Sequence, residues 1–145
     1  MTALLDQVET RLAEVEGLLA VAGAASFAAL MDGKVRPAKT PSAWVIPVAE
    51  RAGPPARATQ VAHQRITVRF GIVIAVREIS DAVGDKASAA IEPVHLAVVD
   101  ALVGWRPEGH DSLVAYAGGR IVGFQTGFAW WLAEYETARF HRGTN

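Results

Sequence analysis

The clearest hydrophobic pattern in the chain is an alternation of apolar and polar positions between Gln60 and Glu78. A period of two with many β-branched residues is typical of a β-strand with one buried face, and its apolar positions are Ile66, Val68, Phe70, Ile72, Ile74 and Val76. Those 19 residues would span roughly 60 Å as a strand, whereas a globule of this size has a radius of gyration of only ~15 Å. The strand must therefore bend or break, or one end must project from the body and pair with a neighbour.

Two segments have the three- and four-residue spacing of amphipathic helices. The first covers residues 2–21, with Thr2 as its cap and Gly23 as its stop, and its apolar stripe is Leu5, Val8, Leu12, Val15 and Leu19. The second follows a turn at residues 81–85 and runs to about Gly104, with Pro93 tolerated only near its beginning. Its stripe is Ala87, Ile91, Val94, Val98, Ala101 and Leu102. Each stripe requires another element to cover it.

The remaining segments predict further strands. Residues 26–31 are a candidate short strand, and residues 43–46 form another that Pro47 ends, inside a proline-rich stretch of loop and edge strand. Residues 113–140 indicate a hairpin whose turn contains the glycine pair Gly118-Gly119. Its second half also fits a helical face, but the glycines there favour a strand.

This order of elements predicts the fold class. Strands grouped together with only two helices indicate an α+β domain, in which an antiparallel or mixed sheet carries both helices on one face and has long hairpin extensions. The chain of 145 residues suits one such domain covering residues 1–145.

Composition narrows the possible functions. The absence of cysteine excludes disulfide frameworks, thiolate metal sites and cysteine nucleophiles, and a net charge of −1 argues against a general nucleic-acid binder. Neither a signal peptide nor a membrane-spanning segment is expected, since the longest uncharged stretch near the start, residues 17–31, is too short to cross a bilayer. We expect a soluble protein that is used without secretion.

Charge is strongly segregated along the chain. Residues 1–32 hold five acids and one base, residues 34–77 hold eight bases and one acid, and residues 78–112 hold seven acids and two bases. Oppositely charged blocks can direct a head-to-tail contact between copies. Alternatively, the blocks neutralise one another within a monomer.

The search for catalytic or metal-binding motifs gives two weak fragments. Glu92 and His95 lie one helical turn apart, as in carboxylate-bridged metal sites, but such sites need ligands from facing helices, and the first helix has no histidine. His110 and Asp111 are a possible base with its orienting acid, but no nucleophile accompanies them. We therefore expect no catalytic residue, no metal site and no cofactor.

Neighbouring Trp130 and Trp131 would face opposite sides of a strand, so at least one is expected to lie outside the main core. An exposed tryptophan beside an apolar strand suggests a protein interface.

The order of several short motifs resembles that of the tail terminator proteins of long-tailed bacteriophages, of the kind found in transposable phages and prophages. The motifs are the first helix, Pro41–Pro47, the long strand, Asp81–Ala87, Ala101–Pro107, Tyr116–Arg120 and an aromatic last strand that ends near Thr137.

The resemblance implies a structural role in the virion. Such proteins form a hexameric ring that caps the tail tube, stops its polymerisation and meets the head connector. The implied partners are further copies, the tail tube protein and connector proteins, with DNA only passing through the lumen and no membrane, and assembly takes place in the bacterial host cytoplasm. The candidate interface residues are Arg51, Arg57, Arg65, Arg69, Arg77 and Trp131.

Two alternatives remain open at this stage. One is another head–tail joining or tail-completion protein of the neck. The other is a small enzyme or ligand-binding domain that uses His110, Asp111 or the Glu92–His95 pair.

Overall fold

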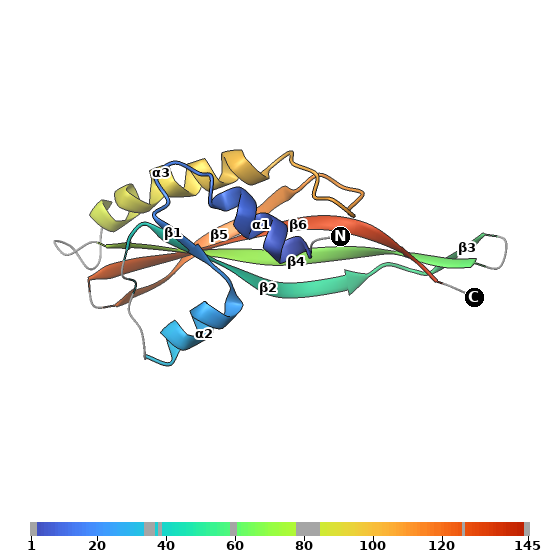
Figure 1. Ribbon diagram of the computed structural model, residues 1–145, viewed down its shortest axis with the longest axis horizontal. Helices are drawn as coiled ribbons and strands as arrows, with labels where there is room; N and C mark the ends of the chain where they lie inside the picture. The colour runs from blue at the N-terminus through green and yellow to red at the C-terminus, as the bar shows by residue number, and fades with distance from the viewer. Residues whose placement is uncertain are drawn as a thin grey trace.

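A twisted mixed sheet organises the molecule (Figure 1). The computed structural model describes residues 3–33, 37, 39–58, 61–77, 85–125 and 127–143. Five strands follow one another across the sheet in the order β1-β2-β4-β6-β5, and β3 pairs with β4 outside this path. Only β1 and β2 are parallel. The strands are β1 (Ala20–Ala22), β2 (Ser42–Ala52), β3 (Ala56–Ala58), β4 (Val61–Arg77), β5 (Ala115–Gln125) and β6 (Phe128–Arg142). With three helices, this confirms the α+β class.

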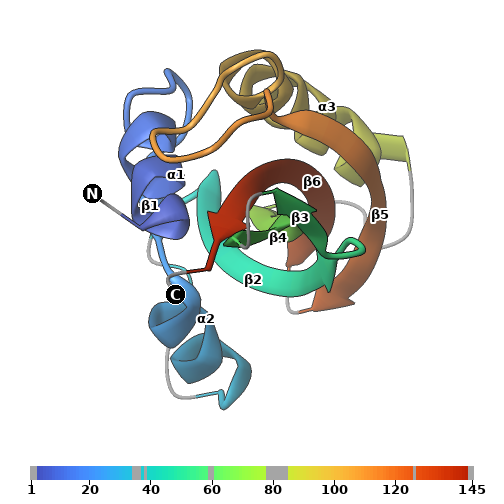
Figure 2. The same cartoon turned by 90° about the vertical axis from the view of Figure 1, so that its right-hand side faces the viewer.

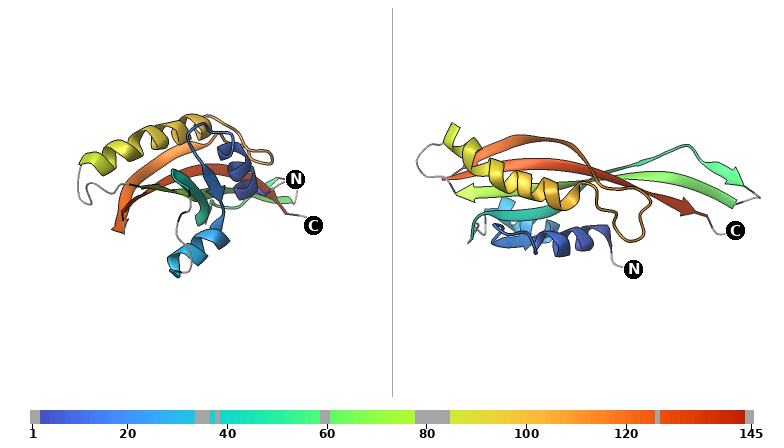
Figure 3. Two further views of the ribbon diagram at one scale, coloured as in Figure 1. Left: turned by 60° about the vertical axis from the view of Figure 1, so that its left-hand side comes forward. Right: turned by 90° about the horizontal axis from the view of Figure 1, so that it is seen from above.

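The long strand β4 runs through the centre of the sheet and has two different halves. Residues 70–76 are buried, whereas residues 63–69 are half-buried or exposed. The first half extends with the ends of β2 and β6 and with β3 beyond the helices (Figures 1 and 3). We call this extension the arm, comprising residues 47–58, 61–69 and 136–142. The 17 residues of β4 span about 56 Å at ~3.3 Å per residue, and the excess length over the body becomes the arm.

Helices α1 (Leu4–Leu12) and α3 (Asp85–Leu102) bury one side of the sheet, which we call the helix side (Figure 2). Both helices contribute to one apolar cluster with alternate residues of β4. Its centre is Phe70, which stacks on Tyr135 of β6 with ring centroids 5.7 Å apart. The buried helix residues of this cluster are Val8, Leu12, Ile91, Val98 and Leu102.

The opposite side of the sheet, which we call the open side, is covered only in part, by helix α2 (Ala24–Met31). Trp44 stacks on Trp130 at 5.7 Å, and Phe27 of α2 packs on Trp44. The prediction of a strand at residues 26–31 was wrong: these residues belong to helix α2, and a short apolar run does not by itself distinguish a helix from a strand. The prediction of a single buried face for the long strand was also wrong over residues 70–76, because α2 and the tryptophans cover the second face.

Both predicted helices differ in detail from the observed ones. Helix α1 ends at Leu12 rather than near residue 21; Val15 and Leu18 still pack against the core from the following turn, but Leu19 is exposed. Pro93 lies in the middle of α3, not near its beginning. Thr2 and the turn at residues 81–84 lie outside the described residues.

Two predicted strand ends were also wrong. Strand β2 continues past Pro47 to Ala52, because the pairing with β4 shifts register between Pro47 and Ala49, and such an irregularity accommodates proline. The glycine pair Gly118-Gly119 lies inside β5 instead of forming the hairpin turn, at another register shift. The strand prediction for the last segment is confirmed.

Gly119 is required by packing rather than by a turn. A Cβ atom at this position would lie 2.5 Å from Cζ2 of Trp131 and 2.5 Å from the hydroxyl oxygen of Tyr116. We expect Gly119→Ala to lower the free energy of unfolding by about 1–3 kcal/mol, since overpacking forces neighbouring rings to move. Urea denaturation measures this loss. Gly123→Ala in the same strand is the control, because its nearest neighbour would be 3.9 Å away; equal losses in both variants would contradict the packing argument.

Candidate subunit-assembly surface

The exposed surface of the helix side is acidic. The chain segments on this side come from the first and third charge blocks of the sequence, and their exposed acids are Asp6, Glu14, Glu16, Glu92 and Asp100. Arg11 is engaged internally: its guanidinium donates a hydrogen bond to the carbonyl of Ala101 and lies 4.9 Å from the centre of the Trp105 ring. The helix side therefore presents mainly negative charge to a partner.

The open side collects arginines from three strands. Alternation along β4 places Arg65, Arg69 and Arg77 on this side, and Arg51 joins them because it pairs with Thr67. Arg120 of β5 pairs with Leu132 of β6, which belongs to the cluster on this side. The basic block of the sequence thus becomes one side of the sheet, opposite the acidic helices.

Two ion pairs cross the arm. Arg69 donates from Nε and Nη2 to Oε1 of Glu136, at 3.0 and 2.6 Å, and this hydrogen bond raises the pKa of Arg69 above its usual value. Arg139 donates from Nη2 to Oε1 of Glu50 at 2.9 Å. The first pair links the neighbouring strands β4 and β6, whereas the second reaches across β4 from β6 to β2. Arg69 is thus paired with Glu136, whereas Arg51 and Arg65 are exposed, and Arg65 donates a hydrogen bond of 3.4 Å from Nη2 to Oγ of Ser112.

Two predicted interface residues, Arg57 and Trp131, do not lie with the arginines of the open side. Arg57 lies in β3 and pairs with Ala62 of β4; the structure describes its backbone only. Trp131 is half-buried on the helix side, with its ring centroid 5.0 Å from that of His95. Trp130 is the tryptophan that lies outside the main core, in the cluster beneath α2. The opposite facing of the two rings therefore follows the prediction.

The histidines considered as possible catalytic or metal-binding residues, His95 and His110, lie beside aromatic rings and backbone groups. His95 packs between Tyr116 and Trp131. Asp111 accepts a hydrogen bond from the amide of Phe140 at 2.8 Å, and Nδ1 of His110 lies 3.2 Å from the carbonyl oxygen of Glu108. Among the residues that the structure describes, no three histidine or carboxylate side chains form a group able to hold a metal ion. No described helix is long and apolar enough to cross a membrane.

A groove of about 850 Å³ runs where the arm leaves the body on the helix side. The start of α1 forms one wall with Leu4 and Leu5, and the arm forms the other with Val48 and Val68. Its polar residues include both partners of the Arg139–Glu50 pair. The groove is open to solvent rather than an enclosed cavity.

Burial of His95 gives a pH-dependent stability. Desolvation lowers the pKa of His95 below its usual 6.5, with Glu92 opposing the shift. The folded state therefore binds a proton at His95 less tightly than the unfolded state does. The folded protein has its full stability above pH ~6.5 and loses stability as the pH falls below that value toward the lower pKa of folded His95. We expect the urea midpoint to fall less between pH 7.5 and 5 in His95→Gln than in the parent. His141→Gln, at an exposed position, should retain the parent's slope, and identical slopes in all three proteins would contradict this assignment.

The chain is an α+β protein whose sheet has an acidic helix side and an arginine-bearing open side. Over residues 2–145 the sequence matches the family described as phage tail terminator protein. The chain belongs to this family and is a structural protein of the phage tail.

Comparison with solved structures agrees at the level of fold. A chain in the structure described as the virion of a native gene transfer agent particle is 17% identical, with a TM-score of 0.59, and the match covers 96% of each chain. No curated protein sequence matches this chain.

Proposed function

We propose that this protein is the terminator of a phage tail. Six copies form a ring that caps the last ring of tail tube subunits, stops polymerisation and presents a surface to the head connector. The observation that carries the proposal is the family match over essentially the whole chain. The opposite charges of the two sides support ring formation, because a closed ring requires two different, complementary surfaces on every subunit.

The arm supplies the contacts that reach beyond one subunit. Its strands extend past the helices, and it exposes Arg51 and Arg65 in a region where the sheet has little cover. An extended ribbon with exposed cations suits an acidic surface on the next subunit or on the tail tube. Arg57, Arg69 and Arg77 belong to the same proposed interface, whereas Trp131 supports it from the interior.

The mature protein resides in the virion, at the junction of tail and neck, after assembly in the host cytoplasm. DNA passes through the lumen of the ring, and no cofactor or membrane takes part. The protein has a structural role without catalysis.

A phage that lacks the gene tests the role. We expect electron microscopy of the lysate to show tails of uncontrolled length, because nothing ends tube growth, and the parent gene supplied from a plasmid should restore one length. Tails of normal length that are not attached to heads would instead identify a head–tail joining protein and contradict termination.

A further inference from the structure

Helix α3 carries an apolar seam on its outer face that the described part of the chain does not cover. Leu96 is 51% exposed and Val103, just after the helix end, is 44% exposed. Glu92 and Asp100 are exposed at the same four-residue spacing. Because these positions share one face of a helix, the surface is a short hydrophobic stripe bordered by negative charge.

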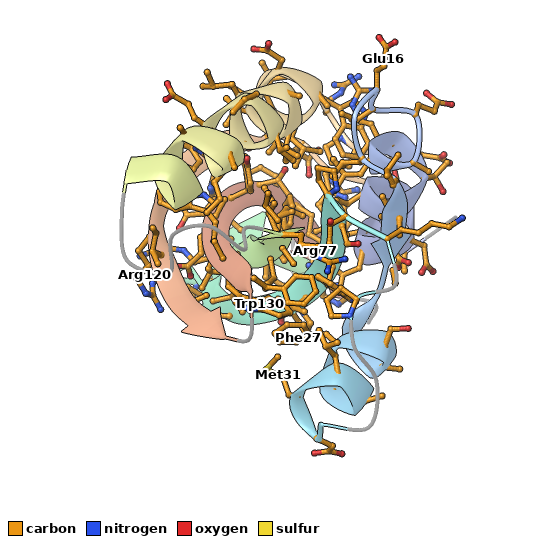
Figure 4. The ribbon with its side chains drawn as sticks, turned by 90° about the vertical axis from the view of Figure 1, so that its left-hand side faces the viewer. Glu16, Phe27, Met31, Arg77, Arg120 and Trp130 are labelled. Atoms are coloured by element: carbon orange, nitrogen blue, oxygen red, sulfur yellow. The ribbon has the colours of Figure 1, made fainter. Side chains whose placement is uncertain are left out.

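The open side of the sheet carries a second apolar feature, a groove. It has a volume of about 260 Å³, and its lining includes Phe27, Met31, Ile46, Val122, Trp130 and Leu132. Met31 is 53% exposed and Val122 is 47% exposed. Figure 4 shows Phe27, Met31 and Trp130 gathered at this place. The groove is therefore apolar, and the side chains that the structure describes fill it only in part.

Arginines border this groove. Arg120 pairs in register with Leu132 of the groove wall; its side chain is 65% exposed, and its Nη1 lies 3.7 Å from Oε2 of Glu134. Arg77 pairs in register with Phe128, whose ring lies 6.4 Å from that of Trp130. Figure 4 labels both arginines on this end of the molecule. Two arginines thus lie beside the apolar groove, together with Glu134 and the exposed Asp32, whereas Glu92 and Asp100 border the apolar seam of α3.

We infer that the outer face of α3 on one subunit binds in the open-side groove of the next subunit. Leu96 and Val103 enter the groove, and Glu92 and Asp100 face Arg77 and Arg120. The occupant is a second copy of this chain, because both halves of the contact are present on each copy with complementary charge. This inference rests on the proposed ring and names the surfaces that join it.

The position of the two surfaces determines the kind of assembly. Helices α3 and α2 lie on opposite sides of the same sheet (Figure 3), and Phe27 and Met31 of α2 line the groove. A contact between unlike surfaces is heterologous, so each bound subunit still offers a free surface to another copy. Such contacts close into a ring when the rotation between neighbours permits it.

Cysteine cross-linking tests the contact directly, because the chain contains no cysteine of its own. The Leu96→Cys and Met31→Cys substitutions are made singly and together, and the proteins are oxidised after incorporation into phage tails. We expect a ladder of disulfide-linked oligomers from the double variant and heterodimers from a mixture of the two single variants. The cross-linked fraction should exceed by at least tenfold that of a control pairing Leu113→Cys, also on an exposed side chain, with Met31→Cys.

The possible outcomes separate the inference from the proposed function. Normal tails without the Leu96–Met31 cross-link would overturn the docking while leaving termination intact. Homodimers of the Leu96→Cys variant would show an isologous contact, and a cross-link from Met31→Cys to the tube protein would show another occupant; either overturns the docking. If this protein is absent from the tail end, the proposed function itself is overturned.

Discussion

Replacing Phe70 with alanine is expected to lower the free energy of unfolding by about 3–5 kcal/mol. The ring is fully buried, lies where the arm joins the body, and stacks on Tyr135 at 5.7 Å. Removal of the ring leaves a cavity beneath α1 and breaks an aromatic pair in the centre of the sheet. A loss of this size is a large part of the stability of an ordinary domain.

Urea denaturation of purified protein measures this effect. Phe140→Ala is the matched control, because Phe140 lies on β6 as Tyr135 does but is exposed on the arm. We expect a loss below about 1 kcal/mol for the control, as for most surface substitutions. Similar losses at the two positions would contradict the description of Phe70 as the centre of the core.

Reversing the charge of Arg51 and Arg65 together is expected to reduce infectious particles by at least tenfold. Both side chains are exposed on the arm, and Arg65 makes one long hydrogen bond, 3.4 Å, to Ser112. The folded subunit should therefore keep most of its stability, whereas the interface loses attraction and gains like-charge repulsion. Each tenfold loss corresponds to about 1.4 kcal/mol, a cost that mismatched charges across an interface readily exceed.

The Arg51→Glu, Arg65→Glu variant is tested by complementation of a phage that lacks the gene. A control variant carries Lys39→Glu and Arg106→Glu, which make the same change in net charge at exposed positions outside the sheet face. We expect the control to complement fully. Equal titres from both variants, with unchanged unfolding midpoints, would contradict the proposal that the arm belongs to the interface.

The strand around Phe70 and the α+β class could be predicted from the sequence, because strict alternation leaves few alternatives. The helix at residues 24–31 could not, because a short apolar run does not distinguish a helix from a strand. The glycine pair in β5 was misleading for a different reason. Gly119 is required by the ring of Trp131, which comes close only when β5 pairs with β6, and by the hydroxyl of Tyr116 in its own strand.

The assembly surface was partly visible in the sequence. The three charge blocks predicted unlike surfaces. The fold separates them in part, because α1 and α3 carry acidic residues on the helix side and the basic segment forms β2 and β4, whereas α2, from the first block, lies on the open side. Arg120 was missed since it lies alone outside the basic block. Leu96 and Val103 gave a signal that was not used: they are large apolar residues outside the buried stripe of their helix.

The most direct test of head-to-tail assembly is electron cryomicroscopy of the tail end with this protein bound. We predict a closed ring at the end of the tube, in which the acidic helix side of every subunit faces the basic sheet of the next. Subunits paired through like sides about a two-fold axis, or a tube end without this protein, would contradict the account.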